Sequence, residues 1–167
     1  MAVNARSRSG FTLTEAMLTV AIVGILASLS VTTMIQVQRF FIMTKARADL
    51  QKEARGIMYI ITRELRQAQN SKITIGRNTN SQPYYSQISF TKQQGTAMSF
   101  FQSGYQLKQT WGGSTRTLSK NLCYLAFSFP RSDDMTIVSV SMTLQLTIFE
   151  GKKKALHMAS EKVRVMD

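Results

Sequence analysis

One carboxylate, Glu15, stands at the edge of a long apolar segment and is the residue best placed to do chemistry. No Asp, Glu, Lys or Arg occurs from Ala16 to Val37. A carboxylate buried in lipid is costly, so it usually has a partner or a function. Two interpretations are open for Glu15: a partner or function within the membrane, or a favourable position at the N-terminus of a helix.

The residues before Glu15 have the charge order of an export signal. Met1 to Gly10 is short, polar and basic through Arg6 and Arg8, and it ends directly before the hydrophobic stretch. Three interpretations compete for this arrangement: a secretory signal peptide, a plain membrane anchor, and a signal that is cut before the hydrophobic stretch.

The length of the apolar stretch and the position of Glu15 help to separate these interpretations. Leu26-Ala27-Ser28 imitates a signal-peptidase site, but the apolar pattern continues to Ile35, which favours a permanent helix. The uncharged run from Ala16 onward is long enough to cross a hydrocarbon core of about 30 Å. A simple anchor has no need of Glu15 near its start, so the third interpretation is favoured.

The residues around this junction resemble the prepilin cleavage and methylation motif of the type IV pilin-like family. They read Gly10-Phe11-Thr12-Leu13-Thr14-Glu15, followed by the apolar run Ala16-Met17-Leu18-Thr19-Val20-Ala21-Ile22. The family pattern is a basic leader, a Gly, a Phe that becomes the mature N-terminus, a Glu fifth in the mature chain, and an unbroken apolar helix. The resemblance is close over about the first 40 residues and extends to the rest only in layout.

The resemblance implies a route of maturation and assembly. A membrane-embedded prepilin peptidase would cut after Gly10 and methylate the new amine of Phe11, and Glu15 would pair with the Phe11 amine of a neighbouring subunit. The implied partners are other pilins or pseudopilins, the prepilin peptidase, the inner-membrane assembly platform and the lipid bilayer. The implied location is the bacterial inner membrane, crossed once with the head in the periplasm or outside, and then a pilus or pseudopilus.

Two further features point toward a minor subunit. Many major pilins have a helix-kinking Pro at the position of Thr32, whereas the first Pro here is Pro83. The segment 57–68, which ends in Leu65-Arg66-Gln67-Ala68, is similar to the end of this helix in J-type minor pseudopilins of type II secretion. We therefore expect a minor pilin or pseudopilin of a type IV pilus or type II secretion filament.

The sequence displays no recognised catalytic or cofactor-binding signature, so we expect a protein that is not an enzyme and has no cofactor or metal. His157 is the only histidine, and Cys123, the only cysteine, is interpreted as a small apolar residue. Asp133 and Asp134 follow Pro130 closely and are interpreted as turn residues, although a cation site there stays open.

The charge balance supplies the alternative function. The chain has 21 Lys and Arg against 9 Asp and Glu. A cationic head could hold DNA phosphates, as in a DNA-binding minor pilin of a DNA-uptake (competence) filament. The candidate contacts are Lys108, Arg116, Lys120, Lys152, Lys153 and Lys154. For the last three, a solvated turn that protects a strand edge is the simpler interpretation.

A single long helix must position the N-terminal site. No Pro interrupts residues 11–69, and Asn70-Ser71 supply a stop signal. In its second half, apolar residues recur every three or four positions and predict a face laid on a core. These residues are Leu50, Ala54, Ile57, Ile61, Leu65 and Ala68. The outward-facing set is Lys52, Arg55, Tyr59, Arg63 and Arg66.

Beyond Ser71 the pattern changes to strands, and the predicted fold class is α+β: a long N-terminal helix packed on a C-terminal antiparallel sheet. The predicted strands are 72–75, 85–91, 97–102, 105–110, 122–129, 136–149 and 156–165, with hairpin turns at Gln102-Ser103-Gly104 and Glu150-Gly151-Lys152. Trp111-Gly112-Gly113-Ser114 is predicted to be a loop. The predicted organisation is a cleaved leader (1–10), a transmembrane or filament-core helix (11–37), an amphipathic head helix (38–70) and a sheet head (71–167).

Overall fold

The computed structural model describes residues 10–131, 133–149 and 153–165, and it contains one α-helix and two antiparallel sheets. Helix α1 runs over Leu13–Leu65, and a short 3₁₀ helix, η1, over Asn70–Lys72. The first sheet has the order β1-β2-β3-β4-β5 and the second the order β6-β7-β8. The bounds are β1 Thr74–Gly76, β2 Gln87–Thr91, β3 Ala97–Ser103, β4 Gln106–Trp111, β5 Ser114–Ser119, β6 Leu122–Ser128, β7 Ile137–Phe149 and β8 Lys153–Arg164. The predicted α+β class is confirmed.

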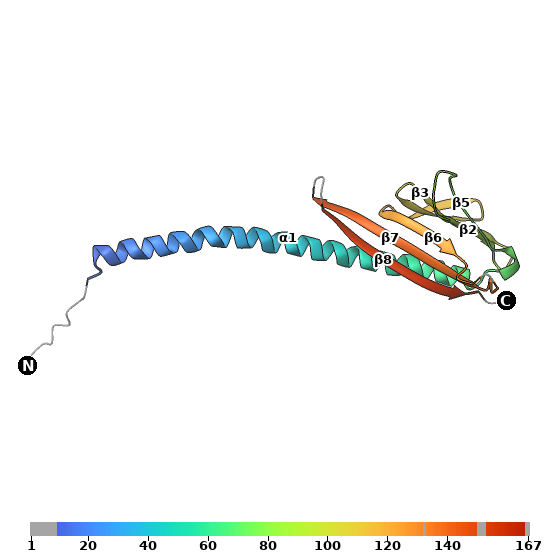
Figure 1. Ribbon diagram of the computed structural model, residues 1–167, viewed down its shortest axis with the longest axis horizontal. Helices are drawn as coiled ribbons and strands as arrows, with labels where there is room; N and C mark the ends of the chain where they lie inside the picture. The colour runs from blue at the N-terminus through green and yellow to red at the C-terminus, as the bar shows by residue number, and fades with distance from the viewer. Residues whose placement is uncertain (1–9, 132, 150–152, 166–167) are drawn as a thin grey trace, which may run out of the picture. The chain divides into compact units, whose positions relative to one another are not determined.

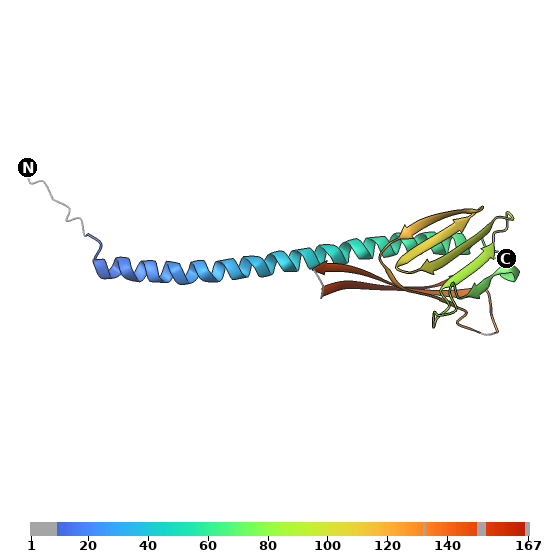
Figure 2. The same ribbon diagram turned by 90° about the horizontal axis from the view of Figure 1, so that it is seen from above.

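The chain divides into two units, with the boundary between Ile42 and Met43. We call residues 43–167 the head unit. In the first unit, every described residue is exposed to solvent. In the head unit, the C-terminal part of α1 runs alongside strands of both sheets (Figures 1 and 2). All of the buried core residues belong to the head unit.

The core of the head unit is built on the predicted apolar face of α1. Leu50, Ala54, Ile57, Ile61, Leu65 and Ala68 are all buried, and they join one cluster with residues of both sheets, among them Phe100, Phe127 and Leu144. The outward set of the same helix is exposed. The 3.6-residue period therefore located this face correctly, because only one stripe of an amphipathic helix can contact the sheets.

Strand β7 confirms the clearest of the predicted strands. Its buried residues are Val138, Val140, Met142 and Leu144, and the Ser and Thr residues between them are half-buried or exposed. It pairs with β6 on one side and with β8 on the other. Because successive side chains of a strand point to opposite faces, one face of β7 packs on the core and the other is open to water.

Strand β5 was not predicted, and the segment predicted as a loop is the tip of a hairpin. Trp111 pairs with Ser114, while Gly112 and Gly113 make the turn with positive φ angles of 54° and 85°. A two-residue turn of this kind needs positive φ at both positions, which glycine supplies. The strand escaped prediction because Ser114-Thr115-Arg116-Thr117 lies at a sheet edge and is polar on both faces.

Helix α1 ends at Leu65, earlier than predicted, because the next residues form hydrogen bonds with the sheet. The Gln69 N–H donates to the Thr91 carbonyl at 2.9 Å, and the Gln67 carbonyl accepts the Gln93 N–H at 3.0 Å. Ala68 forms an isolated bridge with Lys92. Tertiary pairing therefore replaces the last helical turn, a competition that local propensity does not reveal. The predicted turn at 150–152 lies outside the described residues.

Candidate functional site

The first turn of α1 brings together the residues of the predicted N-terminal site. Thr12 precedes the helix, and its Oγ1 accepts a hydrogen bond from the Glu15 N–H at 3.3 Å. The Thr12 hydroxyl is also 3.5 Å from Glu15 Oε2, and the Thr12 carbonyl accepts the Ala16 N–H at 3.1 Å. Thr12 is therefore a side-chain N-cap, because its hydroxyl oxygen satisfies one of the free N–H groups of the helix start.

The capping role of Thr12 was missed, although the sequence carries its signal. Thr12-Leu13-Thr14-Glu15 matches the pattern of a hydroxyl residue followed three positions later by an acid, directly before an apolar run. The cap places the Glu15 carboxylate at the positive end of the helix macrodipole. Glu15 is therefore held locally by the helix start and remains exposed on the surface of the described chain.

Gly10 and Phe11 lie just before the helix and are both exposed. The Phe11 side chain is 73% exposed. A Cβ atom built on Gly10 meets nothing within 4 Å, and Gly10 is not among the glycines with positive φ. Neither packing nor backbone conformation within the described chain therefore explains a glycine at this position.

The following helix presents apolar side chains that nothing in the described chain covers. An 18-residue window has a mean hydropathy of 2.2 and none of it is buried, so α1 is long and apolar enough to cross a membrane. Leu13, Leu18, Val20 and Leu29 are each at least about 60% exposed. Apolar surface left in water costs about 25 cal/mol per Å². This half of α1 therefore needs lipid or other apolar helices around it.

The hydroxyl groups inside this apolar stretch are compatible with lipid. Thr19, Ser28, Ser30 and Thr33 each donate to a backbone carbonyl three or four residues earlier, at 2.8 to 3.0 Å. A polar group in hydrocarbon must find its partner within the protein, and these four find it in their own helix. Their presence does not weaken the membrane interpretation.

The predicted cationic contacts of β4 and β5 do not all project from one face of the sheet. In the β4–β5 ladder, Arg116 pairs with Gln109, and its Nε donates to Gln109 Oε1 at 2.7 Å. Lys108 is the neighbour of Gln109, so its side chain projects from the opposite face of the sheet. Lys120 lies beside Tyr105 and Asn121, at the far end of β5 from the Gly112-Gly113 turn.

The remaining three lysines receive little structural description. The backbones of Lys153 and Lys154 form the start of β8, where they pair with β7. Lys152 lies outside the described residues. The six lysine and arginine candidates therefore stay a prediction.

The predicted turn residues Asp133 and Asp134 have partners within their own loop. Asp134 Oδ1 accepts hydrogen bonds from the Thr136 N–H, at 2.9 Å, and from the Thr136 hydroxyl. These bonds lower the pKa of the Asp134 carboxyl. Asp133 forms an exposed ion pair with Arg131 at 3.9 Å. No group of three or more possible metal ligands occurs among the described residues. Local bonding of this kind is ordinary turn chemistry.

A buried charge cluster was also missed by sequence reasoning. Glu64 is only 5% exposed, and it forms ion pairs with Arg63, at 2.7 Å, and with Lys92. Burial alone would raise the pKa of Glu64, but hydrogen bonds from Lys92 and Arg63 outweigh it and lower the pKa. The Arg63-Glu64 pair is visible in the sequence, but Lys92 comes from the turn after β2, which only the fold brings close.

Comparison with known proteins supports the N-terminal site. Residues 5–31 match a family model described as the prokaryotic N-terminal methylation motif. No curated protein and no solved structure matches the chain. The matched segment covers Gly10, Phe11 and Glu15 and the first part of the apolar helix. The chain thus carries the N-terminal methylation motif of type IV pilin-type proteins on a long apolar helix, joined to an α+β head with a pilin-like layout.

Proposed function

We propose that this protein is a structural subunit, a minor pilin or pseudopilin, of a type IV pilus or type II secretion filament. The observation that carries the proposal is the methylation motif over residues 5–31, which includes the first part of a helix whose apolar side chains are uncovered. The motif supports a type IV pilin-like or pseudopilin precursor in general. The absence of Pro at Thr32 and the Leu65-Arg66-Gln67-Ala68 ending favour the minor class.

In this proposal, residues 1–10 are a leader that prepilin peptidase removes by cutting after Gly10, and the Phe11 amine is then methylated. The exposed junction supports the step, because a peptidase must reach the bond before Phe11. Gly10 supports the step as well. The packing of the described chain does not require a glycine at this position, so the active site of the peptidase can be what requires it.

Assembly would then use the same helix. Residues 11–37 cross the inner membrane once, with the head in the periplasm or outside, and later exchange lipid for neighbouring subunits. Glu15 would attract the Phe11 amine of a neighbour, because opposite charges interact strongly in a medium of low dielectric constant. Residues 38–70 and 71–167 form the head helix and the sheets that the filament displays, and the assembly platform supplies the insertion step.

The processing step gives the most direct test of the proposal. We expect the chain to begin at Phe11, with an N-methyl group, when it is produced together with a prepilin peptidase, and to keep its leader without one. Intact-mass and N-terminal peptide mass spectrometry measure both changes. Gly10→Val should block cleavage, whereas Gly24→Ala, a glycine whose added Cβ also meets nothing, should not. A leader retained in the presence of an active peptidase would refute the proposal.

DNA uptake remains the alternative function, supported by the excess of cationic over anionic residues. It predicts that the purified full chain binds duplex DNA with an affinity that falls steeply with salt, because each neutralised phosphate releases counterions. Fluorescence anisotropy at several salt concentrations measures this. Lys120→Glu should weaken binding if the predicted surface is used, and salt-independent or absent binding removes the alternative.

A further inference from the structure

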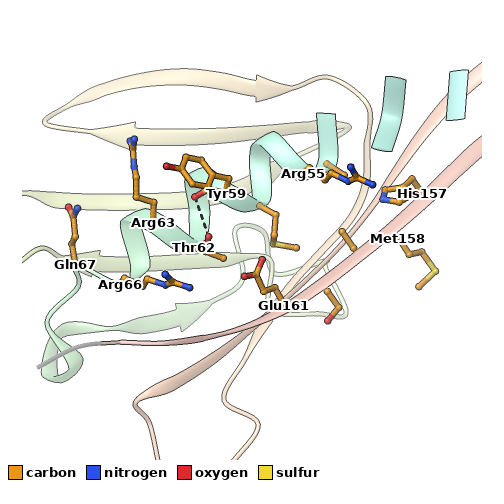
Figure 3. Close-up of a pocket in the computed structure, with 13 residues that line it drawn as sticks. Arg55, Tyr59, Thr62, Arg63, Arg66, Gln67, His157, Met158 and Glu161 are labelled. Atoms are coloured by element: carbon orange, nitrogen blue, oxygen red, sulfur yellow. Dashed lines mark hydrogen bonds between the residues drawn. The ribbon is translucent and has the colours of Figure 1, made fainter. Parts of the chain in front are cut away.

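A groove runs between α1 and strand β8 in the head unit. It has a volume of about 810 Å³ and is lined by Ala54, Arg55, Met58, Tyr59, Thr62, Arg63, Arg66 and Gln67 of α1 and its flank and by His157, Met158, Ala159, Ser160 and Glu161 of β8. Figure 3 shows helical side chains on one side of the groove and the strand on the other. The groove belongs wholly to the head unit and is distinct from the N-terminal site.

The groove opens on the edge of β8, not on one of its faces. Five consecutive residues of β8, His157 to Glu161, line it. Successive side chains of a strand point to opposite faces, so a groove on one face would be lined by alternate residues. β8 is the last strand of its sheet and pairs only with β7 among the described strands. Its outer backbone N–H and C=O groups therefore have no ladder partner in the described chain.

The other sheet edges are short or interrupted, but the edge of β8 is not. β1 has 3 residues, and β4 and β5 are joined across a register shift at Leu107/Lys108. On the β6 edge, the Phe127 N–H donates to the Tyr85 carbonyl at 2.9 Å, and the Leu122 N–H donates to the Tyr105 carbonyl at 2.9 Å. β8 has 12 residues, and its register with β7 shifts only near Phe149.

The middle of β8 also lacks the residues that keep edge strands apart. No Lys, Arg, Asp, Glu or Pro occurs from Ala155 to Ser160. Leu156 and Met158 are 57% and 78% exposed. Native proteins usually protect an open edge with charges, Pro, a bulge or a covering segment. Charged residues stand at both ends of β8, but its middle, residues 155–160, carries none of these protections, and this central stretch of open edge indicates that another segment pairs with it.

The charges beside the edge indicate the chemistry of that segment. In Figure 3, Arg55 extends toward His157 and Arg66 extends toward Glu161, while Tyr59 and Arg63 point away from β8. Neither Arg55 nor Arg66 forms an ion pair with any described residue. Both are exposed on the helix. Two free guanidinium groups beside an open strand edge match an extended segment that carries carboxylates.

We propose that an extended acidic segment of another protein adds a strand to the outer edge of β8 and places its carboxylates against Arg55 and Arg66. Strand addition supplies affinity through backbone hydrogen bonds and specificity through side chains. The two arginines lie about 16 Å apart along the helix axis. Carboxylates at positions i and i+4 of a strand project to one side and are about 13 Å apart, within reach of both long side chains. Symmetric pairing of β8 with the β8 of a second copy is disfavoured, because it would bring arginines against arginines.

The test uses the full chain in nanodiscs of neutral phosphatidylcholine, so that anionic lipid does not compete. A displayed library of random ten-residue peptides is selected on the chain, and the binding of enriched peptides is measured by fluorescence anisotropy. We expect enriched peptides to share two Asp or Glu residues four positions apart. Methylating alternate backbone nitrogens of such a peptide should weaken binding at least about tenfold, because those groups then cannot pair with β8.

A matched pair of charge reversals makes the test specific. Arg55→Glu/Arg66→Glu should weaken binding at least about tenfold. The control Lys52→Glu/Lys120→Glu changes the net charge equally at exposed positions outside the groove and should leave the affinity within about twofold. All four positions are exposed, so the circular dichroism and the melting temperature should stay the same.

Three results would overturn the inference: no enrichment of acidic peptides, equal binding by the methylated peptide, or equal loss in both double variants. Dimerisation of the chain that the Arg55→Glu/Arg66→Glu change abolishes would overturn it too, since the occupant would then be a second copy. The assay uses unassembled protein and does not depend on leader cleavage. Its failure is therefore distinguishable from failure of the proposed function.

Discussion

Replacing Glu15 with alanine is expected to leave the chain in the membrane but to deplete it from filaments at least about tenfold, as expected when one partner of a buried ion pair is removed. Membrane insertion depends on the apolar run after Glu15, which the substitution does not change. Assembly, in the proposed function, depends on the attraction between this carboxylate and a neighbouring Phe11 amine. Quantitative immunoblots of membrane and sheared-filament fractions measure the two steps separately.

The helix cap formed by Thr12 supplies the controls for this experiment. Glu15→Gln removes the charge but keeps an amide oxygen that can accept from Thr12, so it should deplete filaments as Glu15→Ala does. Thr12→Val removes the cap oxygen that accepts the Glu15 N–H and keeps the carboxylate. It should cost only about 1 kcal/mol at the helix end and leave incorporation nearly unchanged. Equal depletion by Thr12→Val and Glu15→Gln would assign Glu15 a capping role and contradict the pairing role.

The parts of the fold that were predictable are those with a strong period. Leu50, Ile57 and Ile61 recur at helical spacing, and Val138 and Val140 alternate with Ser139. All except Ser139 are buried. The spacing of apolar residues along a helix or strand shows which face is buried, so that face can be predicted without knowing what covers it. The class α+β follows from one long helical pattern followed by several strand patterns.

The parts that escaped depend on contacts between distant residues. β5 is polar, and its pairing with β4 becomes visible only when the turn at Gly112 and Gly113 is recognised. The division of the strands into two sheets depends on partner choice, which alternation within a strand does not encode. The β8 groove has the same origin, since Arg55 and His157 are remote in the sequence.

The N-terminal site shows a different division. The spacing of Gly10, Phe11 and Glu15 is local, so the sequence alone located the motif that the family comparison supports. Their roles concern a peptidase and neighbouring subunits, which lie outside a single chain. The structure contributes the helix cap and the uncovered apolar surface of α1.

The second large effect is expected from Glu64→Gln, which should lower the free energy of unfolding of the head by about 3 kcal/mol at neutral pH. Glu64 is nearly buried between Arg63 and Lys92, and the Lys92 side chain is itself only 14% exposed. Removing the carboxylate leaves the Lys92 ammonium without its partner in a poorly solvated position. Trp111, the only tryptophan, lines the same cavity as Glu64 and Lys92, so its fluorescence can follow denaturant unfolding of the full chain in detergent.

The free energy of unfolding of the head should fall at acidic pH, because of Glu64. The pKa of Glu64 is lower in the folded head than the ordinary value, so the folded state holds this proton less tightly than the unfolded state does. The contribution of ionised Glu64 to the free energy of unfolding is therefore complete above the unfolded pKa of about 4.3. It is lost as the pH falls through the lower folded pKa. Wild type should lose stability over that acidic range, and Glu64→Gln should lose less.

Two further variants decide whether the pair itself is responsible. Asp133→Asn removes a carboxylate whose ion pair is exposed, so it should change stability by less than about 1 kcal/mol. Lys92→Met should also destabilise the head, but less than Glu64→Gln does, because Glu64 keeps its ion pair with Arg63 when Lys92 is removed. The double variant Glu64→Gln/Lys92→Met should then be more stable than the sum of the two losses predicts, because it removes both charges together. Strict additivity would mean that Glu64 and Lys92 stabilise the head independently of each other.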